Sequence, residues 1–363
     1  MKTSKKTNIF INKKLVIVAM SGGVDSSVAA ALLKRAGFDL VGVFMKLWNE
    51  ESSCCSLDAS KRARATAEKL KIPFYVLNCQ KQFKEEVVSY FLKELKLGKT
   101  PNPCVFCNKE IKFKLLFKKM EELKADFVAT GHYARFQWEI LNPKSEILKE
   151  TQPKARKLLR AKDKKKDQSY FLWKLNQKEL AKVIFPLGNL TKVEVRQMAK
   201  KMGLPAAKAI ESQEICFIEK DLNAFLKKEL KSKPGKILDL KGNVLGKHQG
   251  LWFYTIGQRK GLPLQQGPWF VIKKDFKKNL LIVSKNEKDL LQKEIYFKEA
   301  NWLQKPEKFP FKARAKIRST SKLASCLVYE RKVVFSQAQK AVTNGQSIVF
   351  YNKNELLGGG IIV

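Results

Sequence analysis

The chain has 363 residues, with 72 lysine and arginine residues against 34 aspartate and glutamate residues, giving a formal net charge of +38. This length allows two or three domains, and a hydrophobic content of 44% is enough for packed cores, so a disordered chain is not expected. The charge favours a polyanionic partner such as nucleic acid, although lysine spread through the whole chain also fits an AT-rich genome without selection for binding.

The N-terminal region predicts no secretory signal, because Lys13 and Lys14 interrupt its apolar segment and no small-residue cleavage site follows. No stretch approaches the ~18 apolar residues of a membrane span. We therefore expect a cytoplasmic protein without membrane contact. The seven cysteines suggest thiol chemistry rather than a secreted disulfide framework; they are Cys54, Cys55, Cys79, Cys104, Cys107, Cys216 and Cys326.

The first predicted elements are a strand and a helix joined by a Ser-Gly-Gly turn, in the stretch KLVIVAMSGGVDSSVAAA at 14–31. The apolar run at 15–20 has the length and β-branched content of a buried strand, and the residues at 24–33 have helical spacing. Unpaired amides at the start of such a helix, together with the helix dipole, favour an anion. Phosphate or pyrophosphate is the predicted ligand, and an ordinary strand-to-helix turn is the alternative.

The turn does not match the usual P-loop. That pattern requires a lysine followed by serine or threonine after the second glycine, whereas this chain has Val24, Asp25 and Ser26 there. A kinase-type phosphate loop is therefore not predicted.

Strand-like and helix-like segments alternate along the next hundred residues, with strands expected at 39–48, 74–78 and 126–130 and helices at 56–70, 82–97 and 111–123. Such alternation predicts a parallel sheet with helices on both faces. Ligands of these sheets bind at the carboxyl ends of the strands. We therefore expect residues 21–27, 45–48 and 130–133 to surround one crevice.

A hairpin is predicted between 135 and 161. Eight of the thirteen residues at 154–166 are basic, which fits either a solvated loop or a contact with a phosphate backbone. The next helix, 191–202, begins with a capping box formed by Thr191 and Glu194 and ends before Gly203. A loop with the sequence IESQEICFI follows at 210–218.

Turns and short strands dominate from residue 231 onward, including GLWFYTIGQRKG at 250–261, and nearly every segment after 294 has a strand pattern. A small barrel or sandwich is the simplest assignment for the C-terminal part. The predicted fold class is α/β, with an N-terminal parallel-sheet domain at 1–220, a small central β-rich domain at 221–286 and a C-terminal β-barrel at 287–363.

The segment KTPNPCVFC at 99–107 is predicted as a proline-stiffened loop before a helix that begins near Asn108. Cysteines at a helix N-terminus have lowered pKa values, and the spacing of Cys104 and Cys107 fits a redox pair, a zinc site or a structural pair. Zinc would need two more ligands, and His132 and His248 show no paired spacing.

Cys216 lies alone in the 210–218 loop, where a packed thiol is the simpler interpretation. If the loop lies near Cys107, one thiol can carry a transferable sulfur while the other resolves the resulting bond.

Seven segments together resemble, in order and spacing, the bacterial tRNA-specific 2-thiouridylase family: SGGVDSS, FMKLW, TPNPCVFCNKEIKF, ATGHYAR, KDQSYFL, SQEICFI and YTIGQRKGL. The resemblance implies a PP-loop ATP pyrophosphatase domain, of the adenine nucleotide alpha hydrolase-like type, followed by a central domain and a β-barrel. It implies adenylation of the C2 carbonyl oxygen of a wobble uridine by ATP with Mg²⁺, then replacement of that oxygen by sulfur. It also implies tRNAs for Lys, Glu and Gln as substrates and a cysteine desulfurase or sulfur-relay protein as donor.

The same resemblance assigns roles to individual residues. Cys107 is implied as the nucleophile and Cys216 as the persulfide carrier, and the two are implied to join transiently as a disulfide. The implied ATP-binding residues are Ala19, Met20, Ser21, Gly22, Gly23, Val24, Asp25, Ser26, Met45 and Gly131. The implied contacts to the target base are Asn102, Pro103 and Cys104, and those to tRNA are Lys166, Asp167, Gln168, Arg318 and Ser319.

Two residues depart from the pattern of many family members. Cys104 stands where some have an aspartate considered an acid-base group, and Ser319 stands where many have an aromatic residue that can stack on a base. Two other functions stay open at this point. One is a PP-loop enzyme that adenylates a small molecule, which would not need paired thiols and a basic surface. The other is a non-enzymatic RNA-binding protein, in which the SGGVDSS turn would have no role.

Overall fold

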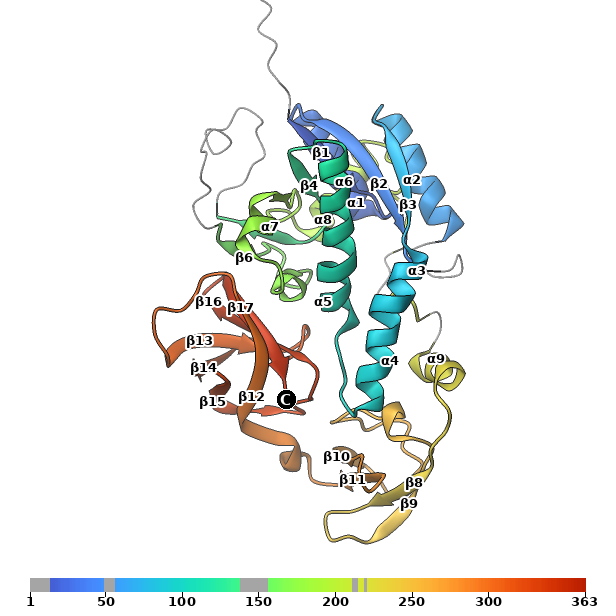
Figure 1. Cartoon of the computed structure of the whole chain (residues 1–363), viewed down its shortest axis with the longest axis vertical. Helices are drawn as coiled ribbons and strands as arrows, with labels where there is room; N and C mark the ends of the chain where they lie inside the picture. The colour runs from blue at the N-terminus through green and yellow to red at the C-terminus, as the bar shows by residue number, and fades with distance from the viewer. Residues whose placement is uncertain (1–13, 49–55, 138–155, 211–214, 219–220) are drawn as a thin grey trace, which may run out of the picture.

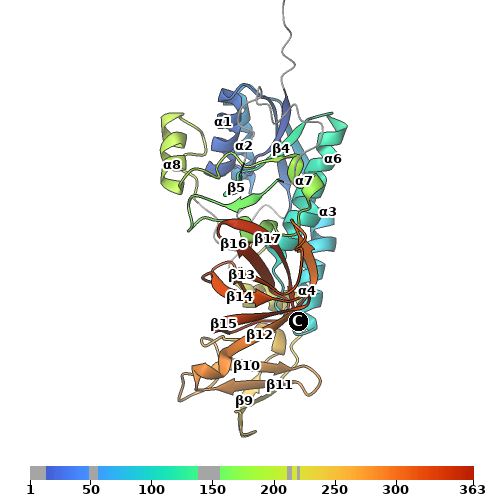
Figure 2. The same cartoon turned by 90° about the vertical axis from the view of Figure 1, so that its left-hand side faces the viewer.

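The computed structural model describes residues 14–48, 56–137, 156–210, 215–218 and 221–363. An α/β part forms one end of an elongated molecule, a β-barrel lies below it, and a small β-rich part lies at the opposite end (Figure 1, Figure 2). Within the described residues, no helix has the length and apolar character needed to cross a membrane.

The N-terminal part is built on a five-stranded sheet in the order β3-β2-β1-β4-β7, and every pairing in it is parallel. Val16, Ile17 and Val18 of the central strand are fully buried, which explains the continuous apolar run of the sequence. The predicted parallel sheet is confirmed. Its strands are β1 Leu15–Ala19, β2 Asp39–Lys46, β3 Phe74–Asn78, β4 Phe127–Ala129 and β7 Val183–Ile184.

Helices cover both faces of this sheet, because alternate residues of a strand point to opposite sides. Val16 and Val18 pack on the side of helices α1 (Val24–Arg35) and α2 (Leu57–Lys69). Ile17 packs on the other side, against α6 (Lys114–Glu122). Since β2 and β4 flank β1, the strand order reverses beside β1, which is where ligands of such sheets bind.

Two long helical stretches run from the sheet toward the other end of the molecule, and each contains a π-helical turn. The first consists of α3 Gln80–Phe83, η1 Lys84–Val88 and α4 Ser89–Lys96, and the second of α5 Pro103–Cys107, η2 Asn108–Phe113 and α6. The second begins at Pro103, so the prediction that it begins near Asn108 was wrong. Asn102 caps it by accepting hydrogen bonds from the amides of Cys104 (3.1 Å) and Val105 (3.3 Å), and proline suits the first helical position.

The predicted hairpin is confirmed as β5 Ala134–Phe136 and β6 Leu158–Arg160, although residues 138–155 lie outside the described part. The capping box of Thr191 and Glu194 is present at the start of α8 Lys192–Lys201. Shorter helices complete the part before residue 231, namely η4 Ser169–Leu172, α7 Gln177–Ala181 and α9 Leu222–Glu229.

The central part is a four-stranded sheet in the order β10-β11-β8-β9. Its strands are β8 Gly235–Leu238, β9 Val244–His248, β10 Phe270–Asp275 and β11 Leu280–Ser284, with the short helices η5 Leu251–Phe253 and η6 Glu287–Leu290. Ile237, Val271 and Leu281 form its small core. The prediction that this central part is rich in β-strands is therefore confirmed.

The C-terminal strands form a closed barrel, because β12 pairs with β15 on one side and with β17 on the other. The sequence patterns had left a barrel and a sandwich both possible. The barrel strands are β12 Leu291–Trp302, β13 Phe311–Lys316, β14 Ala324–Val328, β15 Lys332–Lys340, β16 Ser347–Asn352 and β17 Glu355–Ile362.

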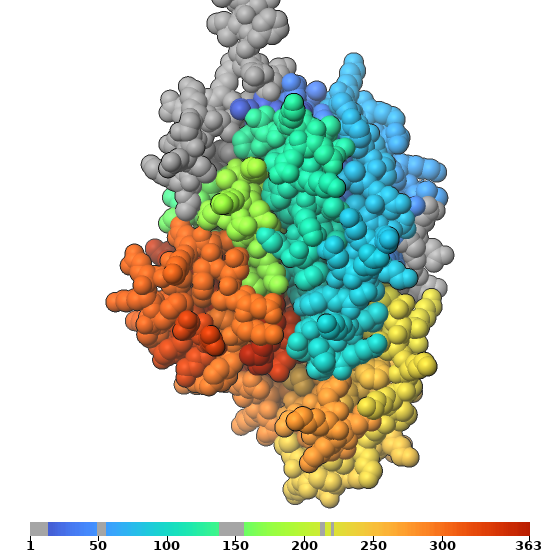
Figure 3. Space-filling model, in the orientation of Figure 1, coloured from blue at the N-terminus to red at the C-terminus, as the bar shows by residue number. Residues whose placement is uncertain are grey.

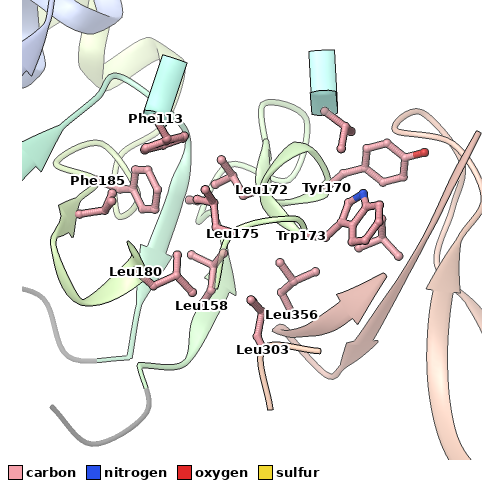
Figure 4. Close-up of a cluster of buried hydrophobic side chains, with 14 of the residues drawn as sticks. Phe113, Leu158, Tyr170, Leu172, Trp173, Leu175, Leu180, Phe185, Leu303 and Leu356 are labelled. Atoms are coloured by element: carbon pink, nitrogen blue, oxygen red, sulfur yellow. The ribbon is translucent and has the colours of Figure 1, made fainter. Parts of the chain in front are cut away.

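The barrel is fixed to the N-terminal part by a shared hydrophobic core (Figure 4). Trp173 is fully buried in it, and its indole nitrogen donates a hydrogen bond to Oγ of Ser347 at 3.0 Å. The hydroxyl of Tyr170 donates to the carbonyl oxygen of Ser347 at 2.8 Å. Strand β6 also pairs with β17, so the hairpin of one part extends the sheet of the other. These contacts hold the two parts in a defined orientation.

The segment before α5 meets the other parts as well. The amide of Thr100 donates to the carbonyl of Asn344 (2.7 Å), and its own carbonyl accepts from Nε2 of Gln346 (2.7 Å). In the space-filling view, this region lies against the barrel and above the central part (Figure 3). The loop that precedes Cys104 is thus positioned by tertiary contacts.

Candidate functional site

Hydrogen bonds of serine residues fix the conformation of the turn after β1. The amide of Ser21 donates to Oγ of Ser26 at 3.1 Å, and the hydroxyls of Ser26 and Ser27 donate to the carbonyl of Gly23 at 3.2 and 2.9 Å. Gly23 caps α1 without a side-chain hydrogen bond. The first amides of α1 are therefore available to an anion, as the sequence predicts.

Two glycines of the site allow contacts that a side chain would block. Gly22 has φ +72°, and a Cβ atom there would lie 2.0 Å from the carbonyl oxygen of Ala59 in α2. A Cβ on Gly131 would lie 2.9 Å from the amide nitrogen of Ser26. The turn is thus packed between α2 and the end of β4 with no room for larger residues.

Asp25, in the first turn of α1, is bound by Tyr133, from the 130–133 segment expected at the crevice, and by Lys192, which the sequence reasoning missed. Its carboxylate accepts a hydrogen bond from the Tyr133 hydroxyl at 2.7 Å, and both of its oxygens lie 2.7 Å from Nζ of Lys192. The capping box at Thr191 identifies Lys192 as the first residue of α8, but nothing local indicates that α8 packs beside α1. Arg62 was missed as well, and its Nε donates to the carbonyl of Gly22 at 3.1 Å.

A cavity of about 260 Å³ opens at the carboxyl ends of β1, β2 and β4, and we call it the nucleotide cavity. The three segments expected to surround one crevice all contribute to it. Its lining contains Ala19, Met20, Ser21, Asp25, Ser26, Met45 and Gly131 from the residues implied for ATP, whereas Val24 is buried in the core beneath. Leu47, Thr130 and His132 also line it, and so does Cys216.

Cys107 and Cys216 belong to the same hydrophobic cluster, although 109 positions separate them in the chain. Cys107 is 4% exposed, and Phe217 beside Cys216 packs against the rings of Trp48, Phe83 and Phe91. These aromatic contacts attach the 215–218 segment to the first helical stretch, and the same hydrophobic cluster includes Cys107 of the second. Residues 211–214 of the predicted loop lie outside the described part.

A second cavity, of about 540 Å³, contains the residues implied for the target base, and we call it the base cavity. Asn102, Pro103 and Cys104 line it from the N-terminal part. Trp252, Thr255 and Gln258 reach it from the central part, and Ser319 and Gln346 from the barrel. All three parts of the molecule therefore build this cavity.

Cys104 does not have the lowered pKa expected for a cysteine at a helix start. Burial raises the pKa of its thiol to about 11, against a smaller opposing effect of the Lys112 charge. Desolvation has a larger effect on the pKa of this thiol than the nearby helix N-terminus, so the thiol is protonated at neutral pH. His132 is likewise neutral, since burial and then the Lys112 charge lower its pKa to about 3.

A third, open cavity of about 970 Å³ lies between the 160–168 segment and the barrel, and we call it the basic groove. Its basic lining residues are Arg160, Lys164, Lys165, Lys166, Arg314, Lys316 and Lys322. Ser319 lines both this groove and the base cavity, and Gln168 lines both this groove and the nucleotide cavity. The basic groove thus shares a wall residue with each of the other two cavities.

Three residues implied as tRNA contacts have structural partners inside the protein. Asp167 accepts hydrogen bonds from Nε of Arg160 (2.8 Å) and the amide of Ala161 (3.1 Å), and its side chain is 1% exposed. Oε1 of Gln168 accepts from the amide of Tyr133 at 2.8 Å.

The third is Arg318, whose guanidinium donates to the carbonyl of Ala341 (2.7 Å), to Oγ1 of Thr343 (2.8 Å) and to the carbonyl of Ile256 (3.3 Å). These contacts connect the barrel with the central part. Among the described residues, no group of three or more His, Cys, Asp or Glu side chains is placed to hold a metal ion together.

Comparison with known proteins covers almost the whole chain. Residues 14–220 match the family described as "tRNA methyl transferase HUP domain", residues 223–285 "tRNA methyl transferase PRC-barrel domain" and residues 292–362 "Aminomethyltransferase beta-barrel domain". A solved structure of NMN synthetase from Francisella tularensis aligns with a TM-score of 0.34 and 16% identity over 55% of this chain and 66% of that chain, a similarity too low to support an argument.

Relatives of nearly equal length are much more similar. The "tRNA-specific 2-thiouridylase MnmA" of Clostridioides difficile strain 630 is 43% identical over 370 residues, covering 98% of this chain and 99% of the relative. The protein of the same name from Moorella thermoacetica is 45% identical over 364 residues, covering 95% of this chain and 98% of the relative. The chain belongs to the tRNA-specific 2-thiouridylase family.

Proposed function

We propose that this chain is an ATP-dependent tRNA-uridine 2-sulfurtransferase that converts the wobble uridine of tRNA to 2-thiouridine, releasing AMP and pyrophosphate. One observation carries the proposal. Cys216 lines the nucleotide cavity while the preceding Ile215 lines the base cavity. Sulfur delivery to an activated base requires a thiol at the boundary between an anion-binding turn and a second cavity. Cys216 has this position.

In the first step, the SGGVDSS turn holds the phosphates of ATP so that the α-phosphorus faces the base cavity. The uridine O2 attacks that phosphorus, and pyrophosphate leaves while the turn amides bind it. Adenylation is needed because a carbonyl oxygen on a pyrimidine is a poor leaving group. Asp25 anchors Lys192 beside the turn, where its cation offsets the charge of the phosphates.

In the second step, Cys216 carries a persulfide. Its outer sulfur attacks C2 of the adenylated uridine, and AMP leaves with the former O2. The Cys107 thiolate then attacks Sγ of Cys216, which releases the thiolated base and leaves a Cys107–Cys216 disulfide. A thiol reductant returns both cysteines to the reduced state.

The base enters through the cavity that Asn102, Pro103 and Cys104 line. Because the Cys104 thiol stays protonated, it serves as a hydrogen-bond donor to the base rather than as a base itself. The basic groove takes the adjacent phosphates through Lys165 and Lys166. Asp167 and Arg318 act as supports for this surface, in keeping with their internal hydrogen bonds.

Several finer assignments belong to the same proposal. Mg²⁺ arrives with ATP, since Asp25 is the only carboxylate among the described residues lining the nucleotide cavity, which suits an ion held mainly by phosphate oxygens. The substrates are tRNAs for Lys, Glu and Gln in the cytoplasm, and a cysteine desulfurase or sulfur-relay protein loads Cys216. The chain divides into domains at 1–220, 221–286 and 287–363.

The decisive experiment combines two measurements on the purified protein with tRNA, ATP, Mg²⁺ and a cysteine desulfurase. Pyrophosphate release should depend on tRNA, and mass analysis of the wobble nucleoside should show the mass gain of one oxygen replaced by sulfur. Release with a small molecule and no tRNA would favour the alternative small-molecule synthetase. No release under any condition would favour a non-enzymatic RNA-binding protein.

A further inference from the structure

The nucleotide cavity contains one cationic side chain that the two-step scheme leaves without a role. Lys112 is the only lysine or arginine among the described residues that line this cavity. It comes from η2, in the helical stretch whose first part, α5, carries Cys104 and Cys107. ATP carries several negative charges, so ATP bound in this cavity would provide an anionic partner for the Lys112 side chain.

The helix aims Lys112 at the cavity. Lys112 and Leu116 are four residues apart, both line the cavity, and such pairs lie on one helix face. The flanking Ile111 and Phe113 are buried in two different hydrophobic clusters. Lys112 lies in the π-helical turn η2, a distortion that is frequent at functional sites. The packing of its neighbours therefore fixes the direction of the side chain.

The charge of Lys112 affects the pKa of one residue in each of the two cavities. It partly opposes the burial that raises the pKa of Cys104, which lines the base cavity, and adds to the burial that lowers the pKa of His132, which lines the nucleotide cavity. Lys112 thus lines the nucleotide cavity, and its charge also acts on a residue in the wall of the base cavity, where the O2 atom of the base must meet the α-phosphorus of ATP.

We propose that Lys112 is a catalytic residue that binds a non-bridging oxygen of the α-phosphate during adenylation and again when AMP departs. This inference rests on the proposed function. The ammonium donates a hydrogen bond and stays protonated. In the first step the bond from O2 to the α-phosphorus forms and the bond from that phosphorus to the bridging oxygen of pyrophosphate breaks. In the second step the C2–O2 bond breaks, and Lys112 stabilises the negative charge on the leaving AMP.

The test compares Lys112→Gln, Lys112→Arg and the wild type in tRNA-dependent pyrophosphate release under single-turnover conditions. Lys112→Gln should lower the maximal rate by about 10²- to 10³-fold, the usual effect of removing one donor to a developing charge. The KM for ATP and the affinity for tRNA should change by less than about threefold, because the contact strengthens in the transition state. Lys112→Arg should recover most of the lost rate.

A stereochemical readout separates this role from a structural one. The two diastereomers of ATPαS place sulfur on one or the other non-bridging α-oxygen, and sulfur is a weaker hydrogen-bond acceptor. The wild type should react more slowly with one diastereomer, and Lys112→Gln should lose that difference. A purely structural defect would slow both diastereomers and leave their ratio unchanged.

Lys114→Gln is the matched control, since it removes a lysine from the same helix whose side chain is 59% exposed and lies 3.9 Å from Glu86, away from the cavity. It should behave as the wild type. A Lys112→Gln protein that releases pyrophosphate at the wild-type rate, or that keeps the wild-type diastereomer ratio, would overturn the inference. A wild-type protein that shows no tRNA-dependent release would instead contradict the proposed function.

Discussion

The nucleotide cavity and the base cavity are neighbours, but they are constructed in opposite ways. The phosphate-binding turn of the first comes from one continuous stretch, and its hydrogen bonds join Ser21, Gly23, Ser26 and Ser27 to one another. The second is lined by residues from all three parts of the chain. A short motif can therefore specify the proposed phosphate site, whereas the proposed base site exists only when distant parts pack together.

This difference separates two ways of losing activity. A change in the turn should damage ATP use and leave the packing of the three parts intact. A change at the contacts between the parts should damage the recognition of tRNA and leave the turn intact. The following predictions test that separation, from the largest expected effect to the smallest.

Replacement of the proposed sulfur carrier should have the largest effect. Cys216→Ser should abolish thiolation of tRNA, since serine cannot carry a persulfide, while tRNA affinity stays within about threefold because the side-chain volume hardly changes. Thiolated nucleoside is measured by mass spectrometry and binding by filter retention. Cys326→Ser, at a buried thiol of the barrel core, is the control and should retain thiolation. Normal thiolation by Cys216→Ser would remove the persulfide assignment.

Gly22→Ala tests the turn by itself. The new Cβ would meet the Ala59 carbonyl oxygen at 2.0 Å, so the turn must move by an ångström or more, and tRNA-dependent pyrophosphate release should fall by about 100-fold. Gly242→Ala is the control, because Gly242 has a similar φ of +89° with nothing within 4 Å of its Cβ position. It introduces the backbone strain without the clash and should leave release unchanged. Wild-type release by Gly22→Ala would show that the turn tolerates a side chain at position 22 and would contradict this prediction.

Ser347→Ala tests the contact between the barrel and the N-terminal part. The buried indole nitrogen of Trp173 would lose its acceptor, which should cost about 1–3 kcal/mol in local stability. We expect reduced hydrogen-exchange protection in β16 and β17, with ATP binding unchanged. Ser325→Ala, at an exposed position of β14, should change protection by no more than about 0.5 kcal/mol. Unchanged protection in Ser347→Ala would show that this hydrogen bond does not fix the barrel.

The smallest effect is expected at the basic groove. Lys165→Gln with Lys166→Gln should reduce the salt dependence of tRNA binding by about 1.4 to 1.8 in the logarithmic slope, because each phosphate contact contributes about 0.7 to 0.9. Lys164 is left out because its Nζ donates to the carbonyl of Ala161 at 2.8 Å and to Oδ1 of Asn354 at 3.2 Å. Lys241→Gln with Lys247→Gln, in the central β8–β9 hairpin, serves as the control. If both double variants have the same slope, the 164–166 segment is a solvated loop and not a contact with the phosphate backbone.

The outcome of the sequence predictions follows the same division between local and distant contacts. The strand at 74–78 and the Thr191 capping box were predicted correctly, because periodicity and capping depend on neighbouring residues. The start of the helix at Pro103 was missed, although Asn102 followed by proline is itself a local start signal. Residues such as Lys192 and Arg62 gave no local signal of a role in the site.

The sequence by itself determined the Ser-Gly-Gly turn, the parallel sheet around it and the three-part organisation, since strand burial, helix spacing and turn residues are properties of continuous segments. Only the tertiary structure decided that the barrel closes, that Cys216 reaches the nucleotide cavity and that the pKa of the Cys104 thiol is raised. These features depend on which surfaces exclude water from one another. Desolvation and packing between residues far apart in the chain have no signature in any single segment.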